Sequence, residues 1–348
     1  MTEITRRGVT ALLAAAAVHA FPGISMAQGR RFAIASITGS WEVAFREIVV
    51  PAFKAANNNP DVALDALIGL DQLAKVTASK GNPPLDTMLL DPGPALVAEG
   101  QGLVEHFPSD RSAHYQDINP NAKTRDGVAP FFIFIGLAYN TDKVKTPPTS
   151  WGDLWKPEYK GRVGITSLNS TLGTGFLVEA ARMRGGSEKN VDEGFKALAE
   201  LRPNLASVAA NPSQAAILFQ QGQIDIAPAV FNEIQLLKAR DVPVDFVLPK
   251  EKGIGYTSTM YITKGSPYQD LAFKFIESML STQVQETMMR EPFLITPTNT
   301  RVKFAGEVAR VLGVDPAQIT EKLVFQDWET INQQRSSWIE RFNREIKL

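Results

Sequence analysis

The stretch FFIFIGLAY, residues 131–139, is an almost continuous apolar run with aromatic character. Because it has no polar face for solvent, the run favours a strand that is buried on both sides. Aromatic and branched side chains are also common in strands. Such a strand lies in the middle of a sheet or passes from one domain to another. We therefore expect the fold to be built around residues 131–139.

Strand-like and helix-like segments alternate in the part of the chain that precedes this run. Apolar runs predict strands, and apolar residues at helical spacing, such as Trp41, Phe45 and Ile48, predict helices. The expected strands lie at residues 32–35, 62–64 and 88–90, and the expected helices at residues 41–52, 70–80 and 95–101. This alternation is typical of a parallel sheet with helices on both faces.

The alternation begins again after the sequence TPPT, residues 146–149, whose prolines break any regular element. Residues 151–160 predict a short helix and turn. Further strands are expected at residues 163–165 and 224–230, and further helices at residues 172–181, 195–201, 212–221 and 268–280. The pattern predicts the α/β class, with two domains joined by ordered strands.

Residues 1–27 have the layout of a cleaved export signal. Arg6 and Arg7 precede an Ala/Leu-rich stretch, and the sequence SMA, residues 25–27, places small residues before a cut at Gln28. The paired arginines also fit a twin-arginine signal, and an amphipathic helix or membrane anchor is the structural alternative. We expect an exported protein that begins at Gln28.

Composition restricts the function. The chain has 348 residues, a formal net charge of −1 and no cysteine, and His106 and His114 are its only histidines beyond the predicted signal. The length suits two domains of ~150 residues each. No basic excess indicates nucleic-acid binding. With two histidines and no thiol, the chain has few residues that could form a His-based metal site or a Ser-His-Asp triad. An enzyme would therefore need carboxylates, lysine or tyrosine as its catalytic groups.

The candidate binding residues follow the predicted strands. Ligands of open α/β sheets bind beyond the carboxyl ends of the strands, where helix N-termini offer free N–H groups. The residues at these ends are Thr38, Gly39, Trp41, Asp91, Ser170, Thr171, Phe231 and Glu233. Each also has a structural interpretation as a core residue or helix cap. Their joint placement on both domains favours a small-molecule site between them.

Several segments resemble the solute-binding proteins of bacterial ABC importers. LAYNTDKV, residues 137–144, and PPTSWGDLWKPEYKGRVGI, residues 147–165, look like the first crossing between the two domains of these proteins. The resemblance continues at residues 224–253, 265–286, 297–302 and 323–346. The most similar subgroup is the spermidine/putrescine-type binders, with ferric-ion, thiamine and aminophosphonate binders as neighbours.

The resemblance implies a two-lobe periplasmic-binding-protein fold whose lobes close on a ligand. Lobe one would comprise residues 28–138 and 257–300, and lobe two residues 139–256 and 301–348. It also implies a periplasmic monomer that binds a small solute, delivers it to permease subunits in the inner membrane, and has neither enzymatic activity nor a cofactor or metal. An exported hydrolase that uses a pair of acids is the alternative from another class, because a fold does not determine a function.

The substrate is where the sequence departs from the polyamine pattern. Trp41, Phe231 and Tyr256 match aromatic wall positions, whereas Ser258 and the pair at residues 170–171 stand where the subgroup implies acids.

A buried dication needs several carboxylates, and only Asp91 and Glu233 remain as candidates. Hydroxyls at a helix N-terminus favour an anionic or zwitterionic group instead. We therefore expect a small organic amine or amino-acid-like solute, with polyamine, phosphonate, carboxylate, thiamine or ferric ion as alternatives.

Overall fold

The strand predicted at residues 131–139 is strand β5, Val128–Asn140, in the computed structural model, and all of its residues are buried. The structure describes residues 30–79 and 81–346. The predicted export signal and its cut before Gln28 lie outside these residues. The strands and helices described below belong to one compact unit, Phe32–Leu348.

Strands and helices alternate along this unit as the sequence predicts. The strands are β1 Phe32–Ser36, β2 Val62–Ala66, β3 Thr87–Leu90, β4 Val104–Glu105, β5, β6 Val163–Thr166, β7 Leu205–Ala209, β8 Ile226–Val230, β9 Val244–Val247, β10 Gly253–Thr263, β11 Thr296–Pro297 and β12 Leu323–Phe325. The helices are α1 Ser40–Ala44, α2 Val50–Ala56, α3 Gly69–Thr77, α4 Pro92–Gly100, α5 Thr171–Arg182, α6 Asp192–Leu201, α7 Pro212–Gln220, α8 Phe231–Lys238, α9 Gln269–Leu280, α10 Thr282–Met289, α11 Gly306–Leu312 and α12 Trp328–Glu345.

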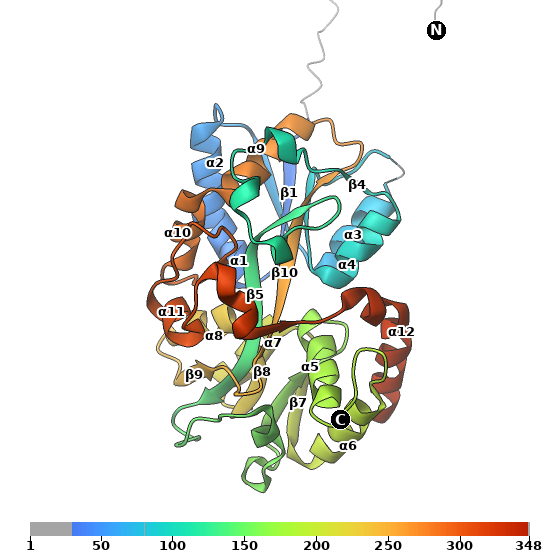
Figure 1. The fold of residues 1–348 in the computed structure, drawn as a ribbon, viewed down its shortest axis with the longest axis vertical. Coiled ribbons are helices and arrows are strands. Elements are labelled where there is room, and N and C mark those ends of the chain that lie inside the picture. The colour runs from blue at the N-terminus through green and yellow to red at the C-terminus, as the bar shows by residue number, and fades with distance from the viewer. Residues whose placement is uncertain (1–29, 80, 347–348) are drawn as a thin grey trace, which may run out of the picture. The chain divides into compact units, whose positions relative to one another are not determined.

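The strands form two parallel groups joined by two long antiparallel strands (Figure 1). The order is β2-β1-β3-β10-β5-β8-β6-β7, and β1 is parallel to β2 and β3 while β6 is parallel to β7 and β8. β5 pairs with β10 along its first part and with β8 along its second. The apolar run therefore passes from one group to the other, and the predicted two-lobe α/β fold is confirmed. The exact lobe boundaries stay a prediction.

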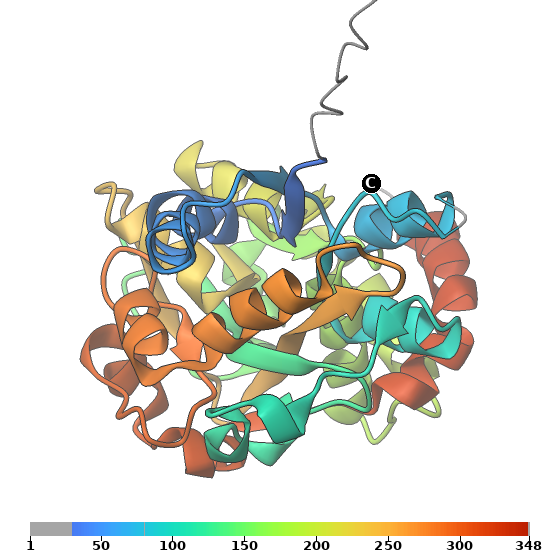
Figure 2. The same cartoon turned by 90° about the horizontal axis from the view of Figure 1, so that it is seen from above.

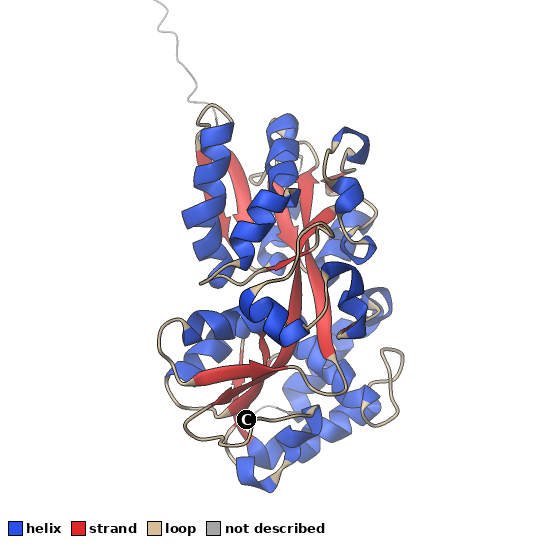
Figure 3. Ribbon diagram, turned by 60° about the vertical axis from the view of Figure 1, so that its left-hand side comes forward, coloured by secondary structure: helices blue, strands red, loops and turns tan. Residues whose placement is uncertain are grey.

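Helices lie on both sides of the strands, as the view from above and the colouring by secondary structure show (Figures 2 and 3). In the first group, the rings of Phe45 and Phe53 both pack edge-on against Phe275 of α9. In β5, a Cβ on Gly136 would lie 2.5 Å from the carbonyl oxygen of Val247 in β9, so only glycine lets β5 and β9 lie this close together.

Three predicted helices differ from the structure near prolines. Residues 151–160 form the 3₁₀ turns Trp151–Trp155 and Pro157–Tyr159, because Pro157 cannot continue a helix and disfavours the α conformation before it. The helix predicted at residues 95–101 begins earlier, at Pro92, a residue suited to a first turn. The helix at residues 41–52 contains a π-helical segment, Phe45–Val49, just before Pro51.

Candidate functional site

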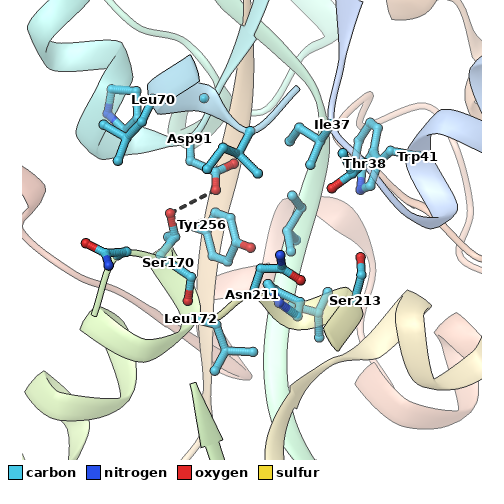
Figure 4. A pocket seen from close by; sticks show the side chains of 18 of the residues that line it. Ile37, Thr38, Trp41, Leu70, Asp91, Ser170, Leu172, Asn211, Ser213 and Tyr256 are labelled. Atoms are coloured by element: carbon cyan, nitrogen blue, oxygen red, sulfur yellow. Dashed lines mark hydrogen bonds between the residues drawn. The ribbon is translucent and has the colours of Figure 1, made fainter. Parts of the chain in front are cut away.

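A cavity of about 390 Å³ lies where the ends of the two strand groups meet (Figure 4). Its wall takes residues from α1, α3 and α4 on one side, from α5, α7 and α8 on the other, and from β5 and β10 between them. The predicted site residues among its lining are Thr38, Trp41, Asp91, Ser170, Thr171, Glu233 and Tyr256. The volume is typical of sites for small molecules.

Gly39, Phe231 and Ser258 were also predicted for the site but do not line the cavity. Phe231 is 1% exposed and stacks on Phe134 at 4.6 Å between ring centroids, so it belongs to the core rather than to an aromatic wall. Gly39 has a φ of 87°, and a Cβ on it would lie 2.7 Å from Oε1 of Glu233. Ser258 is fully buried and contributes through a hydrogen bond to Asp91.

Asp91 precedes α4 but makes no capping hydrogen bond to that helix. Its carboxylate instead accepts one hydrogen bond from the Thr171 hydroxyl, at 2.8 Å, and one from the Ser258 hydroxyl, at 2.5 Å. Burial raises the pKa of Asp91, and the bonds from Ser258 and Thr171 oppose that rise. Asp91 is therefore a carboxylate of the cavity and not a helix cap.

Glu233 of α8 is the second carboxylate of the cavity, and it is buried, with 8% of its surface exposed. Its Oε1 accepts hydrogen bonds from the backbone N–H of Ser40, at 3.1 Å, and from the Ser40 hydroxyl, at 2.8 Å. Burial raises the pKa of Glu233, and the bonds from Ser40 oppose that rise. Oε2 accepts no hydrogen bond from the described residues, so it remains an open acceptor at the cavity.

Two of these hydrogen bonds join the elements on opposite sides of the cavity. Thr171 of α5 bonds to Asp91 beside α4, and Ser40 of α1 bonds to Glu233 of α8. In this structure the two sides of the cavity are therefore in direct contact.

The hydroxyls of Ser170 and Thr171 were predicted to donate to a solute, but in this arrangement both are already engaged. Ser170 Oγ accepts from the N–H of Gly173 at 3.1 Å and donates to the carbonyl oxygen of Ser167, so it acts as the cap of α5. Thr171 donates to Asp91. Ser170 is thus engaged within its own helix start, and Thr171 by the opposite side of the cavity.

The two aromatic residues of the wall, Trp41 and Tyr256, are almost fully buried, at 3% and 5% exposure. Trp41 packs edge-on against Phe131 at 5.6 Å, so it supports the core as well as the cavity. Burial raises the pKa of Tyr256, and the negative charges of Asp91 and Glu233 raise it further. Tyr256 therefore keeps its hydroxyl proton and can donate a hydrogen bond.

Arg335 of α12 also lines the cavity, and sequence reasoning did not identify it. The signal was present: α12 buries a helical stripe whose other members are Trp328, Ile331, Trp338 and Phe342, and Arg335 is the charged residue on that stripe. A cation at a core position is unusual without a partner. Asn211 and Ser213, at the start of α7, are further lining residues that were not predicted.

Residues 30–79 and 81–346 offer neither a metal site nor a membrane-spanning helix. No cluster of three or more His, Cys, Asp or Glu side chains there could hold a metal ion. No helix there has both the length and the apolar character needed to cross a membrane.

Comparison with known proteins supports a binding role. The curated spermidine/putrescine-binding periplasmic protein of Escherichia coli is 24% identical over 244 residues, which are 66% of either chain, so the match spans slightly less than two thirds of that relative. The γ-aminobutyric acid-binding protein of Pseudomonas aeruginosa is 23% identical over 313 residues, 86% of either chain.

A solved structure shows the same fold. The periplasmic binding protein AfuA of Actinobacillus pleuropneumoniae, with fructose-6-phosphate bound, has a TM-score of 0.73 and 24% identity, covering 91% of this chain and 99% of that one. The family model for bacterial extracellular solute-binding proteins matches residues 96–334, more than half of the chain. These proteins bind solutes rather than transform them. The chain belongs to the family of bacterial extracellular solute-binding proteins.

Proposed function

We propose that this protein is the periplasmic solute-binding component of an ABC importer and that it captures a small organic amine or amino-acid-like solute. The observation that carries the proposal is the pair of carboxylates, partly buried Asp91 and buried Glu233, which line one cavity from its two sides. A solute held between them would be released to permease subunits in the inner membrane.

We infer an amino group on the solute from the hydrogen-bond acceptor positions that the two carboxylates leave unused. Oε2 of Glu233 has no donor among the described residues, and each oxygen of Asp91 accepts one bond while it has room for two. A buried carboxylate with unmet acceptors is costly, and an ammonium group supplies both the opposite charge and N–H donors. The amino-group solutes named for the two curated relatives, the polyamines and γ-aminobutyric acid, agree with this chemistry.

The mechanism is closure around the solute. The two sides of the cavity belong to strand groups that the long strands β5 and β10 connect, which suits a hinge. A solute that contacts both sides favours the arrangement in which Thr171 meets Asp91 and Ser40 meets Glu233. No reaction on the solute is required.

A thermal-shift panel on the mature protein tests the substrate class. We expect amino-acid-like and aminophosphonate-like solutes to raise the melting temperature more than putrescine or spermidine does, because stabilisation grows with affinity.

Asp91→Asn and Glu233→Gln should each weaken binding roughly 10-fold or more, since a hydrogen bond to a charged group contributes ~1.5–3 kcal/mol. Asp110→Asn, which changes an exposed carboxylate outside the cavity lining, is the matched control. Polyamines that stabilise the protein best would contradict the proposal.

A further inference from the structure

The guanidinium of Arg335 is held rigidly at the wall of the cavity. Arg335 is 7% exposed, and its Nε donates to the Thr174 hydroxyl at 3.2 Å. Its Nη2 donates to the carbonyl oxygens of Leu168 and Asn169, at 3.1 and 3.0 Å. These acceptors belong to α5 and the loop before it, so three bonds fix the orientation of the planar group.

The remaining nitrogen, Nη1, has no acceptor among the described residues, and Arg335 forms no ion pair with them. Asp91 is near enough to act on Arg335 electrostatically but does not reach it with a hydrogen bond. The acceptors it does have are neutral. Burying a charge that is only partly balanced costs free energy, so an anionic group bound at Nη1 would stabilise the guanidinium.

The start of α4 packs closely against Nη1. A Cβ on Gly93 would lie 2.7 Å from Nη1 and 3.2 Å from Oδ1 of Asn332. Asn332, one turn before Arg335 on α12, donates to the carbonyl oxygen of Gly93 at 2.8 Å. Glycine at this position therefore lets the helix approach the guanidinium without displacing it.

We infer that Arg335 binds the anionic group of the solute and selects for an acid at that end. The inference rests on the proposed amine site and deepens it: Asp91 and Glu233 receive the cationic end, and Arg335 receives a carboxylate or phosphonate through Nη1. The solute class is then a small zwitterion that carries separate amino and acid groups. A simple polyamine would leave the buried guanidinium without its counter-charge.

Binding of matched ligand pairs tests the role of Arg335. Calorimetry would compare 4-aminobutyrate and 2-aminoethylphosphonate with butylamine and putrescine, which lack the acid, on the wild-type protein and on Arg335→Met, Arg335→Lys and Arg344→Met. Arg344 is an exposed arginine on the same helix and serves as the control. We expect the Arg335→Met protein to lose at least 10-fold in affinity for the acids and to bind the simple amines unchanged or better. Arg335→Lys should recover part of the loss, and Arg344→Met should resemble the wild type.

Because Arg335 also anchors α12, a loss of stability alone would not support the inference. Gly93→Ala provides the second variant, since it leaves the Arg335 side chain in place while its methyl group would lie 2.7 Å from Nη1 and crowd that nitrogen. It should reduce affinity for the acids more than for the amines. Equal losses for both ligand classes, or full affinity of Arg335→Met for the acids, would overturn the role of Arg335 and leave the amine site intact. A wild-type protein that binds none of these solutes would overturn both.

Discussion

Individual residues at the site differ in how their buried charge is compensated. Asp91 and Glu233 receive hydroxyl and amide donors, and Arg335 receives carbonyl and hydroxyl acceptors. Glu179 of α5 is the contrasting case, because it is 5% exposed and its Oε2 has no hydrogen-bond partner. The nearest cation is Arg182, whose Nε lies 3.9 Å away. Glu179 is therefore expected to weaken the fold when it is ionised.

Glu179→Gln should reveal this effect as a pH dependence. Burial raises the pKa of Glu179 from 4.5 to about 7, against the opposing effect of Arg182. Between these values the folded protein holds this proton more tightly than the unfolded chain, so the contribution of Glu179 to stability falls as pH rises through the window. At pH 4.5 the variant should unfold at a denaturant concentration similar to that of the wild type. At pH 8 its free energy of unfolding should exceed that of the wild type by up to about 3 kcal/mol.

Urea unfolding at both pH values measures the difference, with Glu340→Gln as the exposed control on α12. A gain of equal size at pH 4.5 and pH 8 would show that the ionisation of Glu179 is not its cause.

Among the elements of the site, α5 is the one whose first turn depends on a close backbone approach. Thr171 and Leu172 line the cavity, and Ser170 caps the helix. A Cβ on Gly173 would overlap the backbone carbonyl oxygens of Thr166 and Ser167. The strand end and the helix start are thus packed more closely than any larger residue permits.

Gly173→Ala should move the first turn of α5 away from β6. We expect a loss of roughly 1–3 kcal/mol in the free energy of unfolding, as in other overpacked sites, together with weaker solute binding. Gly100→Ala is the matched control, because a Cβ at that helical position meets nothing within 4 Å and alanine is the better helix former. Unfolding curves and solute titrations that do not distinguish the two variants would contradict this role of Gly173.

The proposed closure around a solute involves the unit Phe32–Leu348 as a whole. Its two strand groups meet at the cavity, and direct hydrogen bonds already cross it at Thr171 and Ser40. The free energy of closing is then shared between these bonds and the solute. A solute shifts the protein toward the closed arrangement only by the contacts that it makes in the closed arrangement and not in the open one.

Small-angle scattering on the mature protein tests the closure. The radius of gyration should be smaller with a saturating solute from the panel than without it. Thr171→Val removes the hydroxyl that bonds to Asp91, so it should lower solute affinity roughly 2- to 12-fold, the equivalent of ~0.5–1.5 kcal/mol. An unchanged radius of gyration on solute binding would argue for a rigid site.

The sequence by itself determined the alternating elements, the central apolar strand and the family, because hydrophobic periodicity and chain order are local properties. It also placed Asp91, Thr171 and Glu233 at strand ends, which meet at one edge of a sheet whatever the details of packing. The hydroxyls at residues 170–171 lie at the start of α5 and line the cavity, but their hydrogen-bond partners were not predicted.

Only the tertiary structure decided which way side chains point and which distant groups meet. Phe231 turns from the cavity into the core, since the position of a residue after a strand does not tell on which side of the sheet it packs. Arg335 meets Thr174 across 161 residues of chain, and Ser258 meets Asp91 across 167. Such contacts depend on how α12 and β10 pack against elements that lie far away in the sequence. No local sequence pattern carries that information.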